Sequence, residues 1–145
     1  MTSTDCPFCA IANGLDDTVE TIGHGATWVA FFPDAPATTG HTLVIPRQHI
    51  RHLWEAPPEI AESLMSGVVA VGRILMRVLT PDGMNLITSA GVAAEQSIPH
   101  LHLHVVPRWH ADRIGPIWPP KRRKSIAAES DLAERVRREW ALHFG

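Results

Sequence analysis

The sequence predicts a single α+β domain in which an antiparallel sheet of about five strands carries one long helix. Three observations support this class: several short β-rich runs, one long amphipathic segment among them, and a length of 145 residues. A chain of this length can bury a core without disulfide bonds. We expect residues 1–145 to form one domain, with a core over about residues 5–120 and a helical tail over about residues 121–145.

Five runs have the composition of strands. They are rich in β-branched and aromatic residues and are bounded by glycine, proline or other loop residues. The runs are Val19–Ile22, Trp28–Phe32, His41–Ile45, Met84–Thr88 and His100–Val106. Gly23-His24-Gly25 separates the first two runs, which suggests a hairpin.

The best helix is Pro58–Leu79, where apolar residues recur at spacings of three and four and mark one buried face. Thr80-Pro81-Asp82-Gly83 ends it. The pattern also predicts a short helical turn within Ile11–Asp17 and a second amphipathic helix over Ser130–Phe144, which closes the chain.

The charge balance and the apolar runs exclude two classes of partner. The formal net charge is −2, so no overall attraction for nucleic acid is expected. No apolar stretch approaches the roughly 18 residues of a membrane helix, and the first residues do not resemble a signal peptide. We therefore expect a cytoplasmic protein.

The run Lys121-Arg122-Arg123-Lys124 is strongly basic. We interpret it as a solvated loop rather than as a contact with polyanions.

Three histidines alternate with apolar residues near residue 102. Because side chains alternate across a strand, His100, His102 and His104 share one face. Each of these histidines begins about 6.6 Å from the next one along the strand. This spacing suits three groups that line one ligand, or groups that share a metal ion. The alternative is a half-exposed strand whose histidines lie on the surface and have no functional role.

The surrounding residues resemble a known family. The stretch from Gln96-Ser97 through His100-Leu101-His102-Leu103-His104-Val105-Val106 resembles the signature of the histidine triad (HIT) superfamily. Cys6-Pro7-Phe8-Cys9, the run from Gly40 to His49, and Pro107-Arg108-Trp109 follow the order of the family's other landmarks. The resemblance covers about residues 5–120 and extends to the bacterial zinc-containing members.

The resemblance implies a HIT-like fold and a hydrolase or transferase that acts at the α-phosphate of a purine nucleotide. Its substrates would be nucleoside phosphoramidates or dinucleoside polyphosphates. His102 would attack phosphorus and form a covalent nucleotidyl-histidine, and His104 would hydrogen-bond the phosphate. Gln96, Ser97 and Ser89 would contact phosphate oxygens or the leaving group. A nucleotide-binding regulator with weak catalysis is the alternative, and a catalytic metal held by all three histidines is a third.

Two positions depart from the family pattern. Pro33 stands where relatives often carry the aspartate that binds the ribose, so Asp34 is the candidate for that role. Ser89 stands where many relatives have an asparagine that faces the phosphates.

The resemblance also suggests which residues would line a pocket for the base. The candidates are Ile11, Phe31 and Leu43.

A second constellation contains the two cysteines of the chain. Cys6 and Cys9 form a CxxC pair, a spacing that fits one zinc ion, although redox pairs share it. In the zinc-containing relatives two histidines complete the site, and the matching residues here are His49 and His100. The resemblance thus implies a structural zinc. The other histidines are interpreted as structural or surface residues: His24, His41, His52, His110 and His143.

The resemblance also implies a homodimer, because relatives usually pair through the long helix and an edge strand. The apolar segment Ala61–Leu79 agrees with this, although burial within one chain explains it equally well. Trp118 and the C-terminal segment would reach toward the partner's active site.

Overall fold

The computed structural model describes residues 5–118 and 126–144, so the run Lys121–Lys124 lies outside the described residues. The chain divides into two compact units, with the boundary between Ile114 and Gly115. That boundary precedes the expected start of the tail near residue 121, and a single domain over residues 1–145 stays a prediction. The first unit contains α1 (Pro7–Ala12), β1 (Thr21–His24), β2 (Trp28–Phe31), β3 (Thr42–Pro46), η1 (Leu53–Glu55), α2 (Pro58–Leu79), β4 (Gly83–Ile87), η2 (Val92–Ala94) and β5 (Leu103–Arg108), and the second contains α3 (Ile126–Phe144).

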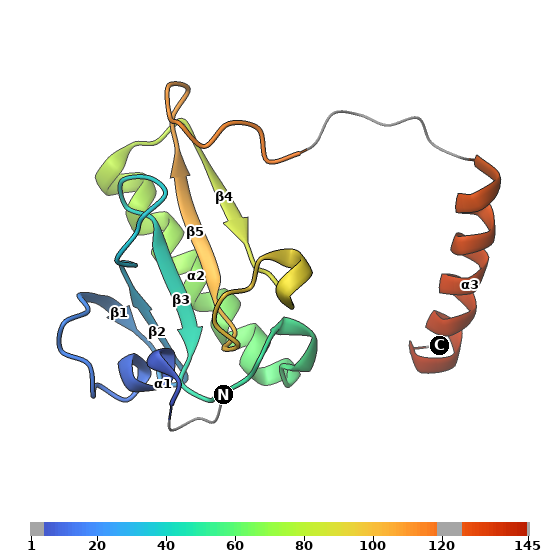
Figure 1. Ribbon diagram of the computed structural model, residues 1–145, viewed down its shortest axis with the longest axis horizontal. Coiled ribbons are helices and arrows are strands. Elements are labelled where there is room, and N and C mark those ends of the chain that lie inside the picture. The colour runs from blue at the N-terminus through green and yellow to red at the C-terminus, as the bar shows by residue number, and fades with distance from the viewer. Residues whose placement is uncertain (1–4, 119–125, 145) are drawn as a thin grey trace. The chain divides into compact units, whose positions relative to one another are not determined.

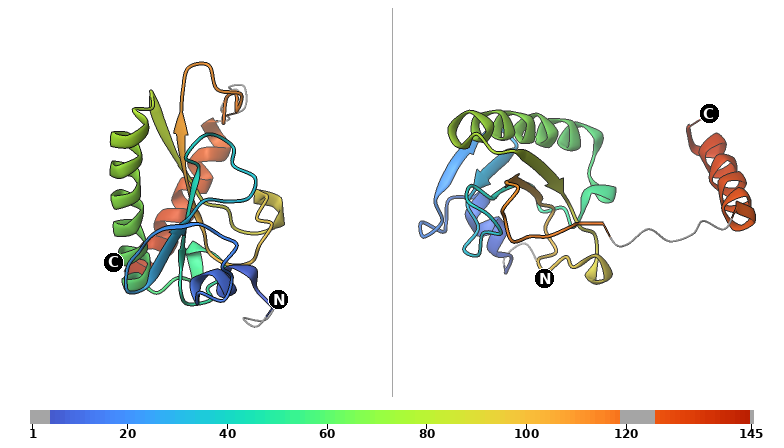
Figure 2. Two further views of the ribbon diagram at one scale, coloured as in Figure 1. Left: turned by 90° about the vertical axis from the view of Figure 1, so that its left-hand side faces the viewer. Right: turned by 90° about the horizontal axis from the view of Figure 1, so that it is seen from above.

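The predicted α+β class and the five-stranded antiparallel sheet are confirmed. The strand order is β1-β2-β3-β5-β4, and every neighbouring pair is antiparallel. The long helix α2 packs along one face of the sheet, and the short helix α1 lies on the other (Figures 1 and 2). β5, which carries the last histidine of the triad, lies between β3 and β4.

The alternation of side chains divides the core into two layers. Val44, Leu101, Leu103 and Val105 pack with Leu64, Val68, Val71 and Leu75 of α2. On the opposite face, Val29, Phe31, Leu43 and Ile45 pack with Phe8, Cys9 and Ile11 of α1. Neighbours in sequence, such as Leu43 and Val44, therefore belong to different layers, as the period of two in a strand requires.

The helix α2 has the predicted bounds, with a proline at its first position and Thr80 as the cap after its last residue, Leu79. Thr80 takes a left-handed conformation (φ 46°), and its N–H donates to the carbonyl of Met76 at 3.2 Å. Neither α2 nor α3 nor any other helix within the described ranges has the length and apolar content needed to cross a lipid bilayer.

Several bounds differ from those that the sequence predicted. α1 begins at Pro7 rather than Ile11, because the fixed φ of proline suits the first position of a helix. β1 lies two residues later than predicted and contains a bulge between Thr21 and Gly23, and α3 begins four residues earlier, at Ile126. β5 begins at Leu103 rather than His100, because the N–H of Leu101 donates to Ile50 instead of a neighbouring strand.

Candidate functional site

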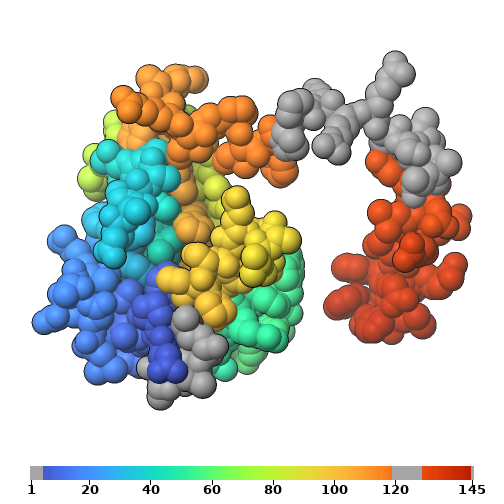
Figure 3. Space-filling view, in the orientation of Figure 1, coloured from blue at the N-terminus to red at the C-terminus, as the bar shows by residue number. Residues whose placement is uncertain are grey.

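The three histidines of the triad lie immediately before and within β5, on the face of the sheet opposite α2. His100 is fully buried, His102 is 6% exposed, and His104 is partly buried. The intervening Leu101 and Leu103 point into the α2 layer, so the predicted alternation holds although the regular strand starts only at Leu103. In the space-filling view, atoms of this orange segment are visible between the yellow segment around η2 and the cyan segment before β3 (Figure 3).

The proton of His102 is fixed by a backbone carbonyl. Nδ1 of His102 lies 2.7 Å from the carbonyl oxygen of His100. A carbonyl oxygen can only accept, so Nδ1 carries the proton and Nε2 of the neutral ring carries the free lone pair. Burial lowers the pKa of His102, which keeps the ring neutral near pH 7. The ring therefore presents a nucleophilic nitrogen at Nε2.

His104 is oriented by a histidine to which the sequence interpretation gave no function. The N–H of Ala37 donates to Nδ1 of His41 at 3.0 Å, which leaves the proton of His41 on Nε2. That Nε2 lies 2.9 Å from Nδ1 of His104 and donates to it. The remaining proton of His104 must then sit on its Nε2. His104 can thus donate a hydrogen bond to an anion, and its ring lies 4.9 Å from that of His102 between centroids.

The place of His41 beside His104 could have been predicted from its position in β3, although the sequence analysis did not use that position. β3 and β5 are antiparallel, with Leu43 opposite His104. His41 stands two residues before Leu43, so its side chain points to the same face as His104 and is its diagonal neighbour. Gly40, with φ +77°, makes the turn that brings His41 to this place, and a Cβ at Gly40 would lie 2.3 Å from Cδ1 of Leu79.

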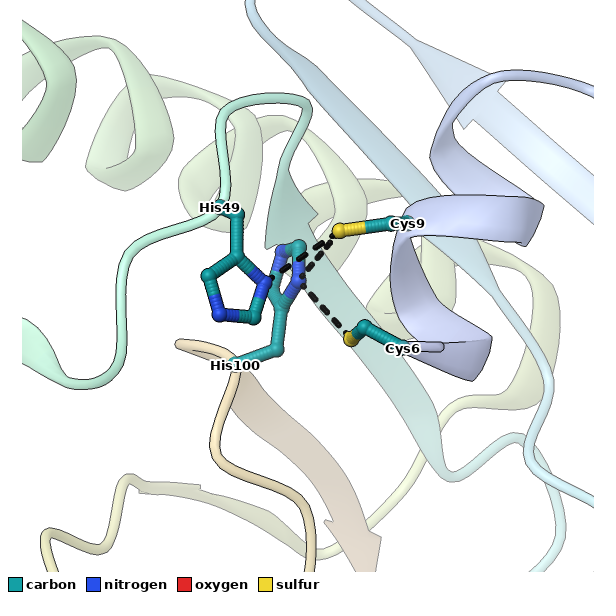
Figure 4. Close-up of side chains that lie close together, drawn as sticks. All are labelled: Cys6, Cys9, His49 and His100. Carbon is teal, nitrogen blue, oxygen red and sulfur yellow. Dashed lines mark hydrogen bonds between the residues drawn. The ribbon is translucent and has the colours of Figure 1, made fainter. Parts of the chain in front are cut away.

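The four predicted metal ligands come together on the N-terminal side of the triad. Cys6 and Cys9 come from α1 and its first flank, His49 follows β3, and His100 precedes β5 (Figure 4). Their ligand atoms lie within 4.8 Å of one another. Nδ1 of His100 is 3.5 Å from each sulfur, and Nδ1 of His49 is 3.2 Å from Sγ of Cys9.

This cluster fits a tetrahedral zinc ion. Zn–S bonds of about 2.3 Å and Zn–N bonds of about 2.05 Å place S and N ligands about 3.6 Å apart. Nε2 of His100 donates to the carbonyl of Pro46 at 2.9 Å, which leaves Nδ1 as the bare nitrogen toward the sulfurs. Within the described part of the chain, this is the one group of three or more possible ligands that converges, and it holds only the first triad histidine. The geometry therefore does not support a metal ion held by His100, His102 and His104 together.

The remaining predicted contact residues lie in the segment between β4 and β5, which leads into the triad. Ser89 follows β4, whose last residue, Ile87, pairs with His104, and Thr88 donates to the carbonyl of His102 at 2.9 Å. The side chain of Gln96 accepts from the N–H of Gly91 and donates to the carbonyl of Arg51, so it ties the loop to the segment after β3. Ser97 is exposed.

The candidates for ribose and base contacts lie on the α1 side or beyond β2. Asp34 is exposed in the loop between β2 and β3, and within the described residues it makes no hydrogen bond or ion pair with the histidines of the triad. Ile11, Phe31 and Leu43 are buried in the layer beneath α1, where Phe8 contacts the ring of His102 edge-on at 5.3 Å between centroids. Whether these residues contact a ligand stays a prediction.

Known proteins resemble this chain over most of its length. The Protein hit of Bacillus subtilis is 33% identical over 115 residues, which are 79% of each chain. The Adenylylsulfatase HINT3 of Arabidopsis thaliana is 28% identical over 91% of this chain and 66% of its own. Among solved structures, a HIT family protein from Bacillus anthracis has a TM-score of 0.85 at 29% identity and covers 95% of this chain and 99% of its own.

A further solved structure and a family model complete the comparison. The histidine triad nucleotide-binding protein of Candida albicans has a TM-score of 0.78 at 25% identity and covers 94% of this chain and 98% of its own. The model of the HIT domain matches residues 17–111, which contain β1 through β5 and the whole triad. On these grounds the chain belongs to the HIT domain family.

Proposed function

We propose that this protein is a nucleotide-binding hydrolase or transferase that acts at an α-phosphate through a covalent nucleotidyl-His102 intermediate. The observation that carries the proposal is the hydrogen bond from Nδ1 of His102 to the carbonyl of His100, because it leaves the lone pair on Nε2. The substrates are purine nucleoside phosphoramidates or dinucleoside polyphosphates. Membership in the HIT family and the nucleotide-binding title of the Candida relative support this class.

The chemistry proceeds in two displacements at phosphorus. In the first, Nε2 of His102 forms a bond to the α-phosphorus, and the bond to the leaving group breaks. The electron pair departs on a phosphate, or on an amine that takes up a proton from solvent. His102 is then cationic, and its Nδ1–H still donates to the carbonyl of His100. In the second, water attacks phosphorus and releases a proton to solvent, the P–N bond breaks, and its electron pair returns to Nε2. The Nε2–H of His104 donates to a phosphoryl oxygen as charge develops there.

The loops around the triad supply the substrate contacts in this proposal. Ser89 and Ser97 hydrogen-bond phosphate oxygens or the leaving group, and Gln96 acts in the same loop. Asp34 takes the ribose contact that Pro33 cannot make, since proline offers no side-chain acceptor. The position of Ser89, two residues beyond the β4–β5 pairing, supports its share of this role.

The nucleophile is tested by comparing His102→Ala with the control His110→Ala, in which the same change is made at an exposed position. Turnover of adenosine phosphoramidate, a diadenosine polyphosphate and adenylyl sulfate would be measured, and acid-quenched samples would be examined by mass spectrometry for a nucleotidyl adduct. We expect His102→Ala to lose about 10⁴-fold in rate or more, and the adduct with it. Undiminished turnover by His102→Ala would disprove the assignment.

A catalytically weak nucleotide-binding regulator is the second candidate. Pro33 and Ser89 favour it, because both lack the side chains with which relatives usually hold the nucleotide. Titration calorimetry with nonhydrolysable purine nucleotides distinguishes the two. Micromolar binding together with neither turnover nor an adduct would favour the regulator, and an adduct on His102 would eliminate it.

We also propose that Cys6, Cys9, His49 and His100 hold a structural zinc ion. When bound, zinc would cross-link the N-terminus to the two segments that flank the triad, with four protein ligands and no open position. A reducing compartment such as the cytoplasm would keep both thiols available, and both are free cysteines here. Elemental analysis should find one zinc per chain, lost in Cys6→Ser. Full activity of zinc-depleted protein would agree with a structural role.

A homodimer is the proposed assembly. The outer face of α2 exposes Val69, Ile74 and Val78, and the edge strand β4 exposes Leu86 and Ile87. These residues form apolar surfaces on the two elements through which the family resemblance implies pairing. Light scattering of the full chain should give twice the mass of one chain, and Ile74→Glu should lower it. A monomer at all concentrations would contradict the proposal.

A further inference from the structure

The hydrogen bonds of the triad rings limit which of their protons can leave. In the proposed first displacement two rings lie at the phosphoryl group: His102, whose Nε2 attacks, and His104, whose Nε2–H donates to an oxygen. A leaving group that departs as a strong base, such as an amine, must receive a proton as its bond to phosphorus breaks. The partners of the two rings decide whether either ring can supply that proton.

His102 cannot protonate the leaving group. Its single proton lies on Nδ1, 2.7 Å from the carbonyl oxygen of His100, and its Nε2 uses the free lone pair for the bond to phosphorus. The side chain is buried, so the Nδ1–H stays with the carbonyl throughout the displacement. His102 therefore acts as the nucleophile and not as an acid.

His104 cannot become the imidazolium ion that would serve as a general acid. Its Nδ1 accepts the Nε2–H of His41 at 2.9 Å, and His41 keeps its proton there because its own Nδ1 accepts from the N–H of Ala37 at 3.0 Å. A cationic His104 would carry a second proton on Nδ1, and that proton would face the Nε2–H of His41, donor against donor. Burial lowers the pKa of both rings, which agrees with neutral forms.

A neutral His104 that gave up its Nε2–H would not regain a proton from its neighbour. The hydrogen bond at Nδ1 offers the Nε2–H of His41 as a replacement. His41 would then be an imidazolate whose remaining partner is the backbone N–H of Ala37, a group that does not ionise near neutral pH. His41 is only 7% exposed, so water has little access to its ring. The hydrogen bonds from Ala37 to His104 thus orient a donor without supplying it with protons.

We infer that this site favours nucleoside 5′-phosphoryl substrates whose leaving group departs as a weakly basic anion, and that His41 sets this preference as a positioning residue. The preferred class is the phosphoric anhydrides, in which a phosphate, sulfate or carboxylate oxygen is joined to the α-phosphorus. Nε2 of His102 bonds to phosphorus, the P–O bond breaks, and its electron pair leaves on oxygen without any proton transfer. A P–N bond breaks in this way only after solvent has protonated the nitrogen. The inference rests on the proposed function and selects among its substrates.

A series of aryl esters of adenosine 5′-monophosphate measures proton donation directly. Substituents on the ring vary the pKa of the leaving phenol, while the nucleotide stays the same. Because kcat/KM reports the first displacement, departure without a proton should lower kcat/KM about fivefold or more for each unit by which the phenol pKa rises. The values of kcat/KM in D₂O should equal those in H₂O. Esters are chosen whose kcat/KM lies well below the diffusional ceiling of about 10⁸ M⁻¹s⁻¹.

Two substitutions of His41 separate the orientation of His104 from its charge. His41→Gln keeps a neutral N–H donor toward Nδ1 of His104, so the steep dependence on phenol pKa should remain. His41→Glu offers a carboxylate that accepts a proton from Nδ1 and stabilises a cationic His104, so the dependence should flatten to about twofold or less per unit. A merely structural role of His41 would change all esters by one factor. His24→Glu, at an exposed position, is the matched control and should behave as wild type.

The possible failures are distinguishable. Turnover by the wild type that is nearly independent of phenol pKa, or about twofold slower in D₂O, would overturn the inference and leave the nucleotidyl-His102 intermediate in place. Neither turnover nor adduct with any ester would overturn the proposed function and the inference together. A steep dependence that persists in folded His41→Glu would disprove the role of His41. If that variant does not fold, loss of the steep dependence in His41→Gln would disprove it instead.

Discussion

The imidazoles of the site are held in defined tautomers by backbone groups and by one another. The carbonyl of His100 fixes the proton of His102 on Nδ1, and the carbonyl of Pro46 fixes that of His100 on Nε2. The N–H of Ala37 fixes His41, which in turn fixes His104. Three neighbouring rings of one residue type thus differ in their surroundings, and the proposed function assigns them three different tasks: metal ligand, nucleophile and hydrogen-bond donor. Their surroundings differ, although their sequence context is nearly the same.

His41→Leu should reduce kcat/KM without unfolding the protein. Without the donor at Nε2 of His41, the proton of His104 is free to move to Nδ1, and Nε2 becomes an acceptor that repels a phosphoryl oxygen. The loss of a charge-assisted hydrogen bond corresponds to a reduction of about ten- to a hundredfold. The ¹⁵N shifts of His104 should change from a single tautomer to a mixture. The exposed His24→Leu serves as control, and an unaltered His104 tautomer in His41→Leu would contradict the relay.

His104 should titrate far below an ordinary histidine. Burial, followed by the charges of His102 and His41, lowers the pKa of His104 to about 4. Between pH 6.5 and 4 the unfolded chain therefore binds a proton that the folded chain refuses, so the free energy of unfolding falls on acidification. Urea unfolding across this range should show the decline, and His104→Gln should weaken it. An NMR titration of His104 with a midpoint near 6.5 would contradict the prediction.

At the scale of elements, α2 lies against the sheet through a close contact between a glycine and a tryptophan. A Cβ built on Gly67 would lie 2.6 Å from ring atoms of Trp28 in β2. Gly72, in the same helix, would have only Sδ of Met84 nearby, at 3.4 Å. The two glycines therefore differ in packing, although both lower the intrinsic helix propensity.

Gly67→Ala and Gly72→Ala should change stability in opposite directions. Crowding of Trp28 costs about 1–3 kcal/mol, which exceeds the gain of about 1 kcal/mol in helix propensity at Gly67. At Gly72 the gain in propensity should prevail, by up to about 1 kcal/mol. Urea unfolding of both variants measures the difference. Equal shifts of the same sign would show that the Trp28 contact does not limit the approach of α2.

At the scale of the whole first unit, the Cys/His cluster joins segments that are far apart in sequence. It links residues 6 and 9 to residues 49 and 100 and so spans both flanks of the triad. Burial, with the neighbouring Cys6 thiol, raises the pKa of the Cys9 thiol to about 11, so without a metal ion the thiol stays protonated. Binding of zinc as a thiolate complex must then displace protons.

Removal of zinc by a chelator should lower the thermal midpoint, and its return should release protons. The midpoint falls because the metal binds the folded state, whose ligands are assembled, more tightly than the unfolded chain. Scanning calorimetry measures the first effect, and a weakly buffered indicator measures the second. Cys6→Ser is the control, since its midpoint should respond to neither treatment. A wild-type midpoint that is independent of chelator would exclude a stabilising metal.

The sequence predicted the placement of much of the candidate site because that placement follows from short, regular spacings of histidine and apolar residues along the chain. A spacing of two placed the triad histidines on one face, and spacings of three and four gave the buried face of α2. The role of His41 was not predicted, because it depends on the diagonal approach of β3 to β5. The early end of regular pairing before Leu103 was also missed, since Leu101 finds its backbone partner in Ile50.

The sequence by itself determined the fold class, the long helix and the shared face of the triad, and through family resemblance it gave the candidate metal ligands Cys6, Cys9, His49 and His100, which the structure brings together. Only the tertiary structure decided which nitrogen of His100 and of His104 carries its proton. The physical reason is that a ring's tautomer is set by the acceptor or donor within about 3 Å, and these partners, Pro46, Ala37 and His41, reach the triad only when separate strands are brought together.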